Sequence, residues 1–153
     1  MINYIGYGFD TNEIDDEIWY NLAKTYDADQ VEKHLKNSFD SDITDDEMIS
    51  EEYKITDAVD FIDENFISRS EYLRNIINAK ESKKAGTNYI VSNYDNYLVF
   101  DCVRFADDSK RSKYIRSTKD FIAMIKRYIT IDGIKFGNLY EGSDWFDPAY
   151  ELQ

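Results

Sequence analysis

The sequence predicts an α+β fold in which an N-terminal strand and an acidic helical half pack with an antiparallel sheet. Apolar residues recur at helical spacing over the first half of the chain, whereas from about residue 88 they follow the two-residue period of strands. One strand, four to five short helices, a hairpin and a further helix are the order typical of the α+β class. Because 153 residues with six Gly and one Pro leave little room for a flexible linker, we expect a single domain over residues 1–153.

The expected first strand covers residues 2–9, where Ile, Tyr and Phe alternate around Gly6, a residue that can accommodate a β-bulge. A helix capped by Thr11 or Asn12 should follow, because apolar side chains then recur along one helical face as far as Tyr26. Four carboxylates lie in its first turns, where the helix dipole favours negative charge.

Further helices are expected between about residue 27 and Gly86, which ends the helical half. Each would begin at a residue whose side-chain oxygen can accept a hydrogen bond from a backbone N–H of the first turn. One of these signals is a capping box, which predicts a helix over about 45–53. The expected caps are Asp27 or Asp29 for the first helix, Thr44 with Glu47 for the second, Thr56 or Asp57 for the third and Ser70 for the fourth.

The second half of the chain changes to strand periodicity. Residues 88–93 and 97–105 are rich in β-branched and aromatic side chains and are separated by a short polar turn, so they predict a hairpin over about 88–105. The other expected elements are a strand over 112–117, a helix over about 118–129 capped by Ser117 or Thr118, and a strand near 134–140.

Charge divides the chain into unequal parts. Residues 10–66 hold 19 acidic residues and four lysines, for a net charge of −15, whereas residues 67–135 carry +6 and residues 136–153 carry −4. We therefore distinguish an acidic helical part (about 10–66), a neutral-to-basic part (about 67–140) and a short acidic, aromatic tail (141–153). An anionic surface repels nucleic acid and anionic membranes across a Debye length of about 10 Å. A basic protein is the expected partner.

The composition also favours a cytoplasmic protein. No apolar run approaches the roughly 18 residues that a membrane span needs, and no cationic segment followed by an apolar stretch opens the chain. The single cysteine, Cys102, suits a reducing compartment, and its place in an apolar strand indicates a buried side chain and not a nucleophile.

One segment matches the oxygen spacing of a calcium-binding EF-hand loop. The sixth position of such a loop needs glycine for its sharp turn, and here it is Asp45. The capping box would also start a helix inside the loop, so we expect no calcium site. The residues that match are Asp40, Asp42, Thr44, Asp46 and Glu51.

Other catalytic and cofactor patterns are incomplete. His34 is the only histidine, which excludes a His pair for zinc and leaves a catalytic triad without local support, so we expect a surface side chain. Gly6 and Gly8 lack the third glycine of a dinucleotide-binding fingerprint, because that position is Thr11. The acidic runs are typical of solvated surfaces and not of the apolar pocket that raises the pKa of a glycosidase acid. We expect no enzymatic activity, no cofactor and no metal.

A short basic stretch over residues 110–116 interleaves lysine and arginine with Tyr114, a pattern that can bind phosphate or RNA. We interpret it as counter-charge for the acidic half of the protein or for its tail.

The functional surface is expected within the acidic helices. Glu13 and Glu47 have local uses at helix starts, but the density of carboxylates over residues 40–64 has no such explanation. Like charges three or four residues apart on a helix cost roughly 0.2–0.5 kcal/mol each, so stability alone would favour intermixed lysines. The expected partner-binding residues are Asp40, Asp42, Asp45, Asp46, Glu47, Glu51, Glu52, Tyr53, Asp57, Asp60 and Glu64.

In size, acidity and compact α+β pattern, the chain resembles the small inhibitors of host defence encoded by phages and mobile elements, the anti-CRISPR and antirestriction proteins. The resemblance rests on composition over the whole chain and not on a motif, so it assigns no residues. It implies a non-enzymatic nucleic-acid mimic that occupies the basic groove of a CRISPR effector or restriction enzyme in the cytoplasm of a bacterial host.

Three alternatives stay open at the level of sequence. An immunity protein that neutralises a basic nuclease toxin would show the same acidic helices and aromatic residues. A metal-binding or carboxylate-dependent enzyme is the second alternative, and an acidic surface that serves only solubility is the third. Genomic neighbourhood separates inhibitor from immunity protein, and a melting scan with calcium, magnesium or EDTA tests the metal-dependent enzyme.

Overall fold

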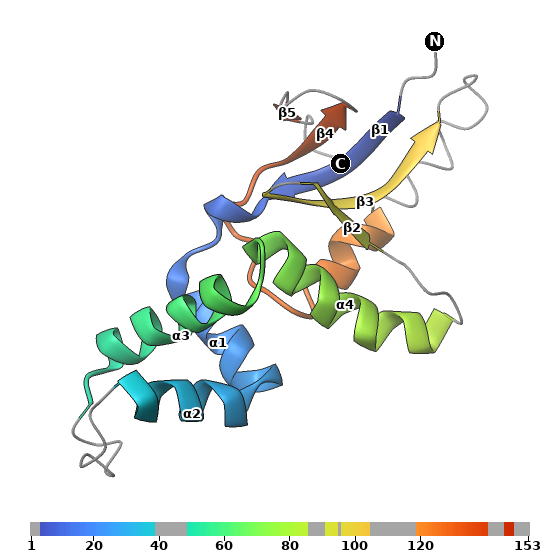
Figure 1. Cartoon of the computed structure of the whole chain (residues 1–153). Coiled ribbons are helices and arrows are strands. Elements are labelled where there is room, and N and C mark those ends of the chain that lie inside the picture. Colours follow the sequence, from blue (N-terminus) through green and yellow to red (C-terminus); the bar gives the residue numbers. More distant parts are fainter. Residues whose placement is uncertain are drawn as a thin grey trace.

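The protein has a five-stranded antiparallel sheet with its helices on one side (Figure 1). The computed structural model describes residues 4–38, 49–85, 91–94, 96–104, 119–140 and 146–148. The α+β class predicted from the sequence is confirmed. The elements are β1 (Tyr4–Asp10), the 3-10 helix η1 (Thr11–Glu13), α1 (Asp16–Tyr26), α2 (Ala28–Ser38), α3 (Glu51–Asn65), α4 (Arg69–Ala85), β2 (Val91–Tyr94), β3 (Tyr97–Arg104), a helix over 119–125, β4 (Phe136–Tyr140) and β5 (Phe146–Pro148).

The strand order is β2-β3-β1-β4-β5, so the N-terminal strand lies at the centre of the sheet. A register shift between Ile5 and Tyr7 places an irregularity at Gly6, where a bulge was expected. Gly8 has no room for a side chain, because a Cβ there would overlap the carbonyl oxygen of Leu98 on β3. The predicted hairpin is formed by β2 and β3, and the predicted strand near 134–140 is β4.

The start of the first helix differs from the prediction. Asp10, not Thr11 or Asn12, provides the first cap, and its carboxylate accepts a hydrogen bond of 2.9 Å from the backbone N–H of Asn12. This N-cap begins only the short helix η1. The backbone is then extended at Ile14 and Asp15, and α1 begins at Asp16. Ile14, at this break, is 3% exposed and belongs to the hydrophobic core.

Helix α3 is one continuous helix where two were predicted. Its N-cap is Ser50, whose hydroxyl accepts a hydrogen bond of 3.2 Å from the N–H of Tyr53, so this helix begins at Glu51 and not near residue 45. Thr56 and Asp57 are therefore interior helical residues and cap nothing. The expected capping box of Thr44 and Glu47 lies outside the described residues.

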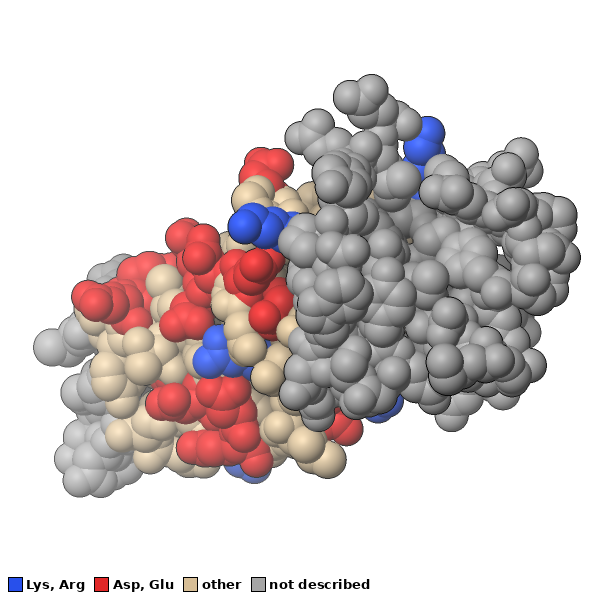
Figure 2. Space-filling model, turned by 90° about the horizontal axis from the view of Figure 1, so that it is seen from above, with Lys and Arg blue, Asp and Glu red and all other residues tan. Residues whose placement is uncertain are grey.

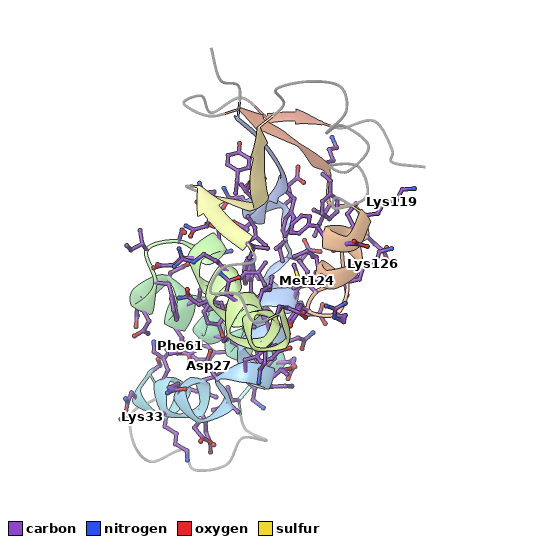
Figure 3. All side chains as sticks on the ribbon, turned by 90° about the vertical axis from the view of Figure 1, so that its right-hand side faces the viewer. Asp27, Lys33, Phe61, Lys119, Met124 and Lys126 are labelled. Atoms are coloured by element: carbon purple, nitrogen blue, oxygen red, sulfur yellow. The ribbon has the colours of Figure 1, made fainter. Side chains whose placement is uncertain are left out.

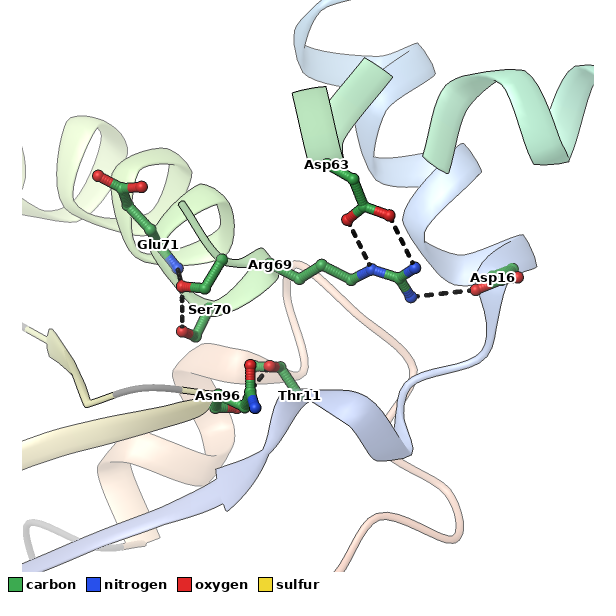
Figure 4. A network of polar contacts seen from close by, with 8 residues as sticks. Thr11, Asp16, Asp63, Arg69, Ser70, Glu71 and Asn96 are labelled. Atoms are coloured by element: carbon green, nitrogen blue, oxygen red, sulfur yellow. Dashed lines mark hydrogen bonds and ion pairs between the residues drawn. The ribbon is translucent and has the colours of Figure 1, made fainter. Parts of the chain in front are cut away.

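The cap of α4 is also displaced from the predicted position. The hydroxyl of Ser68 accepts the hydrogen bond from the N–H of Glu71, at 3.2 Å, and also contacts the hydroxyl of Ser70 at 2.8 Å (Figure 4). Ser70 lies inside the helix and is fully buried, so it cannot serve as the cap. Because positions 68 and 70 are both serine, the sequence alone does not show which of them caps the helix.

The C-terminal part follows the prediction only in outline. The predicted helix over 118–129 is described over 119–125 and passes into turns before residue 129. The predicted strand over 112–117 and the basic stretch over 110–116 lie outside the described residues.

A common hydrophobic core joins the acidic helices to the sheet. Trp19 of α1 packs on Tyr72 of α4 with ring centroids 6.5 Å apart, and Phe9 of β1 meets Phe136 of β4 at 5.2 Å. Phe121 reaches the same Phe136 ring at 6.4 Å. The helices α1, α2 and α3 also contact one another, while α4 contacts β2 and β3. The acidic half is thus held by the same core as the sheet.

The charged side chains lie on the outside of this core. In Figure 3 the side chains of Phe61 and Met124 lie in the interior, whereas Lys33 extends outward at the lower end and Lys119 and Lys126 on the right-hand side. Among the helices in the described part of the chain, none combines the length and apolar character that spanning a membrane requires.

Candidate functional site

The predicted partner-binding residues fall into a described and an undescribed group. Asp40, Asp42, Asp45, Asp46 and Glu47 lie outside the described residues. The others belong to α3. They are Glu51, Glu52, Tyr53, Asp57, Asp60 and Glu64.

Helix α3 presents part of this set to solvent. Glu51, Glu52 and Asp60 are exposed, and none of them forms an ion pair with another described residue. Tyr53 is 39% exposed beside them and offers an aromatic ring at the edge of the acidic surface. This part of the predicted site therefore forms an accessible anionic face.

Asp57 does not belong to that face. Its side chain is only 4% exposed, and its carboxylate lies 2.9 Å from Nδ1 of His34 on α2. Asp57, Asp60 and Glu64 were all expected in the partner-binding surface, but packing of α2 against α3 buries Asp57. The structure thus places Asp57 in the contact between α2 and α3 and not on the exposed face of α3.

Exposed carboxylates are also present on α1 and α2. Asp15 and Glu17 at the start of α1 and Asp29 at the start of α2 are exposed and form no ion pair within the described residues. Figure 2 shows carboxylates over much of the helical half on one face of the molecule. The sequence-based site missed these three residues because their position in first helical turns already explained their charge.

Other carboxylates of the helical half have internal partners. Asp16 and Asp63 both receive hydrogen bonds from Arg69 (Figure 4). Glu13 accepts a hydrogen bond of 3.1 Å from the N–H of Lys135, and Glu32 pairs with Lys36 at 3.0 Å. These contacts separate structural acids from those that remain available to a partner.

His34 is not the exposed surface histidine that the sequence suggested. Its side chain is 18% exposed and lies between α2 and α3, with Nδ1 at 2.9 Å from Asp57 and Nε2 at 2.8 Å from Glu64. Burial of the ring lowers its pKa, but the hydrogen bonds and negative charges of the two carboxylates outweigh that effect and raise the pKa above 6.5. The His34 and Phe61 rings also pack in a T-shaped arrangement with their centroids 5.8 Å apart.

A pocket of about 280 Å³ lies where α1, α3 and α4 meet. Its wall includes Tyr72, whose hydroxyl donates a hydrogen bond of 2.6 Å to Asp27, and Phe66, whose ring centroid is 4.7 Å from that of Tyr72. Burial and the neighbouring Asp27 carboxylate raise the pKa of Tyr72 far above its usual range, so the phenol stays neutral. This hydrogen bond ties α4 to the turn between α1 and α2.

The described residues contain no group of three His, Cys, Asp or Glu side chains that could hold a metal ion. Of the EF-hand-like run, only Glu51 lies within those residues, and it is exposed at the start of α3. The chemistry that the arrangement offers is thus an anionic surface on packed helices, with a histidine between two carboxylates at its edge.

Comparison with known proteins identified no family model that matches this chain, and no match among curated proteins or solved structures.

Proposed function

We propose that this protein is a non-enzymatic inhibitor whose acidic helical half binds a basic, nucleic-acid-binding groove of a partner protein. The observation that carries the proposal is a set of exposed carboxylates that form no internal ion pair within the described residues, on three helices that pack together. They are Asp15, Glu17, Asp29, Glu51, Glu52 and Asp60.

None of the lysines of this half forms an ion pair with that set within the described residues. Lys24 lies over the ring of Tyr20, 4.8 Å from its centroid, and Lys36 pairs with Glu32. The exposed carboxylates therefore keep a negative potential on the helical surface, which would steer a basic partner and make association depend strongly on salt.

A basic groove built for nucleic acid is the partner surface that fits best. Such a groove binds phosphates through lysine and arginine, and carboxylates held on helices can meet the same cations. Tyr53 adds an aromatic ring that could anchor the contact, since tyrosine is enriched among residues that dominate binding energy. We infer a CRISPR effector or a restriction enzyme in the cytoplasm of a bacterial host as the partner, blocked without any chemical reaction.

The test compares two variants with the same change in net charge. Glu52→Lys with Asp60→Lys reverses two carboxylates of the proposed surface, whereas Asp120→Lys with Asp132→Lys reverses two exposed carboxylates of the sheet half. Tagged proteins would be used to capture partners from a bacterial lysate at low salt, and circular dichroism would confirm that both variants fold. We expect the first variant to lose the partner and the second to keep it.

Competition with duplex DNA completes the test. DNA should displace the captured partner, and capture should fall steeply between about 50 and 200 mM salt, because several charge pairs form together. Equal capture by both charge-reversed variants, or a partner that DNA cannot displace, would contradict the proposal. A captured nuclease toxin in place of a defence enzyme would assign the same surface to an immunity protein.

A further inference from the structure

Both ring nitrogens of His34 face carboxylate oxygens. Nδ1 lies 2.9 Å from Oδ2 of Asp57, and Nε2 lies 2.8 Å from Oε2 of Glu64. A carboxylate oxygen only accepts hydrogen bonds, so each nitrogen must carry a proton for both contacts to be hydrogen bonds. A neutral imidazole has one N–H and can satisfy only one of the two. The geometry therefore belongs to the imidazolium form of His34.

The two carboxylates differ in their access to water. The Asp57 side chain is 4% exposed, whereas the Glu64 side chain is 64% exposed. When His34 loses a proton, Nδ1 should keep its hydrogen for the buried Asp57, because an unpaired buried carboxylate is costly. The Nε2 lone pair would then face the Glu64 carboxylate and repel it, and Glu64 can turn into solvent at little cost.

We propose that His34 is a protonation-dependent gate on the acidic surface. The protonated ring holds Glu64 against the α2–α3 contact, and the neutral ring releases the Glu64 carboxylate to the exposed face of α3 that also carries Asp60. Deprotonation also makes the helical half more negative by one charge. The gate is a property of the free protein, whereas its effect on a partner rests on the proposed function.

The charged groups around the ring favour this behaviour. From α3 the ring is faced by Asp57 and Glu64, together with the uncharged ring of Phe61. On α2 itself the nearest cations in sequence are Lys33 and Lys36, both exposed, and Lys36 is already paired with Glu32. From α1, which packs against both helices, no charged side chain within the described residues pairs with His34.

Binding of a cation to Glu64 should then release a proton. A lysine or arginine of the partner competes with the imidazolium for the same carboxylate, so binding favours neutral His34 and lowers its pKa. By linkage, affinity for a cationic partner should rise as the pH increases through the pKa of His34.

Because His34 is the only histidine, the imidazole carbon and proton NMR signals report its titration without overlap from another histidine. The measurement compares the wild type with Glu64→Gln and with Asp120→Asn, a control at an exposed carboxylate of the sheet half. We expect a wild-type pKa above 6.5, a lower value in Glu64→Gln and a wild-type value in Asp120→Asn. The side-chain carboxyl carbon signal of Glu64 should shift over the same pH range as the ring.

A wild-type pKa at or below 6.5, or one that Glu64→Gln leaves unchanged, would overturn the gate. Glu64 is exposed, so Glu64→Gln should fold, and its amide spectrum verifies this.

The interface role is tested separately by calorimetry with an oligolysine peptide in two buffers of different ionisation enthalpy. Proton release in the wild type and in Asp120→Asn, but not in Glu64→Gln, would support it. No proton release in any of the three would contradict the interface role, while the NMR titration alone decides the gate.

Discussion

Arg69 and Asp63 form a two-pronged ion pair at the corner between α3 and α4. The Nε and one terminal nitrogen of the guanidinium donate to the two carboxylate oxygens, at 3.1 and 3.2 Å. The other terminal nitrogen donates to Asp16 at the start of α1, at 3.2 Å, so one side chain links three helices (Figure 4). Arg69 is 26% exposed, whereas Asp63 and Asp16 are 50% and 60% exposed, so water partly screens these contacts.

Replacing Arg69 should therefore destabilise the helical half. We expect Arg69→Ala to lower the free energy of unfolding by about 1–2 kcal/mol, because charge-assisted hydrogen bonds to two carboxylates are lost together. Arg69→Lys should recover only part of this, since an ammonium cannot form the two parallel bonds. Urea unfolding measures both, with Lys33→Ala as a control at an exposed lysine. Equal stability of Arg69→Ala and this control would refute the structural role of the pair.

Asp57 and Asp60 lie one turn apart on α3 but should respond differently to the same substitution. Asp57→Ala removes a buried partner of His34 and should lower the free energy of unfolding by about 2–3 kcal/mol. Asp60→Ala removes an exposed carboxylate with no ion pair in the described structure and should change stability by less than about 0.5 kcal/mol. Thermal or urea unfolding of the two variants side by side checks this, and a similar loss in both would show that Asp57 is not specially placed.

The contribution of His34 to stability should depend on pH in one direction. Its pKa is raised in the folded protein, so its two hydrogen bonds stabilise the fold fully below the unfolded pKa of about 6.5. This contribution should be lost as the pH rises through the folded-state pKa. The difference in unfolding free energy between the wild type and His34→Gln should thus shrink at alkaline pH. Thr56→Ala, at an exposed position of α3, should show a constant difference. A gap that widens with pH would contradict the imidazolium assignment.

Asn78 of α4 should stabilise the edge strand β2. Its side-chain amide donates to the carbonyl of Val91 and accepts from the N–H of the same residue, both at 3.0 Å, as a neighbouring strand would. Val91 is 1% exposed, so Asn78→Ala would leave two poorly hydrated backbone groups and should cost about 1–3 kcal/mol. Hydrogen exchange at the Val91 amide should accelerate in that variant and not in Asn37→Ala, an exposed control on α2. Unchanged protection in both would remove the role assigned to Asn78.

Local patterns in the sequence predicted much of the fold because they depend on neighbouring residues. The two-residue period over 88–105 identified the hairpin, and Gly6 marked the irregularity in β1. Helix starts were less predictable. Several serine, threonine and aspartate residues lie close together before each helix, and only one of them can be its N-cap. Ser50 and Ser68 were chosen over their neighbours by the packing of α3 and α4, which no local pattern contains.

The sequence by itself determined the α+β class, the segregation of charge into residues 10–66 and the residue types available on α3. Only the tertiary structure decided which carboxylates of the described residues have an internal partner and which are exposed without an ion pair. Asp57 and Asp60 are the same residue type on the same helix, yet burial against α2 pairs the first with His34 and leaves the second in water. The reason is physical: the charge of a side chain follows from its identity, but its solvation and its partners follow from contacts between segments far apart in the chain.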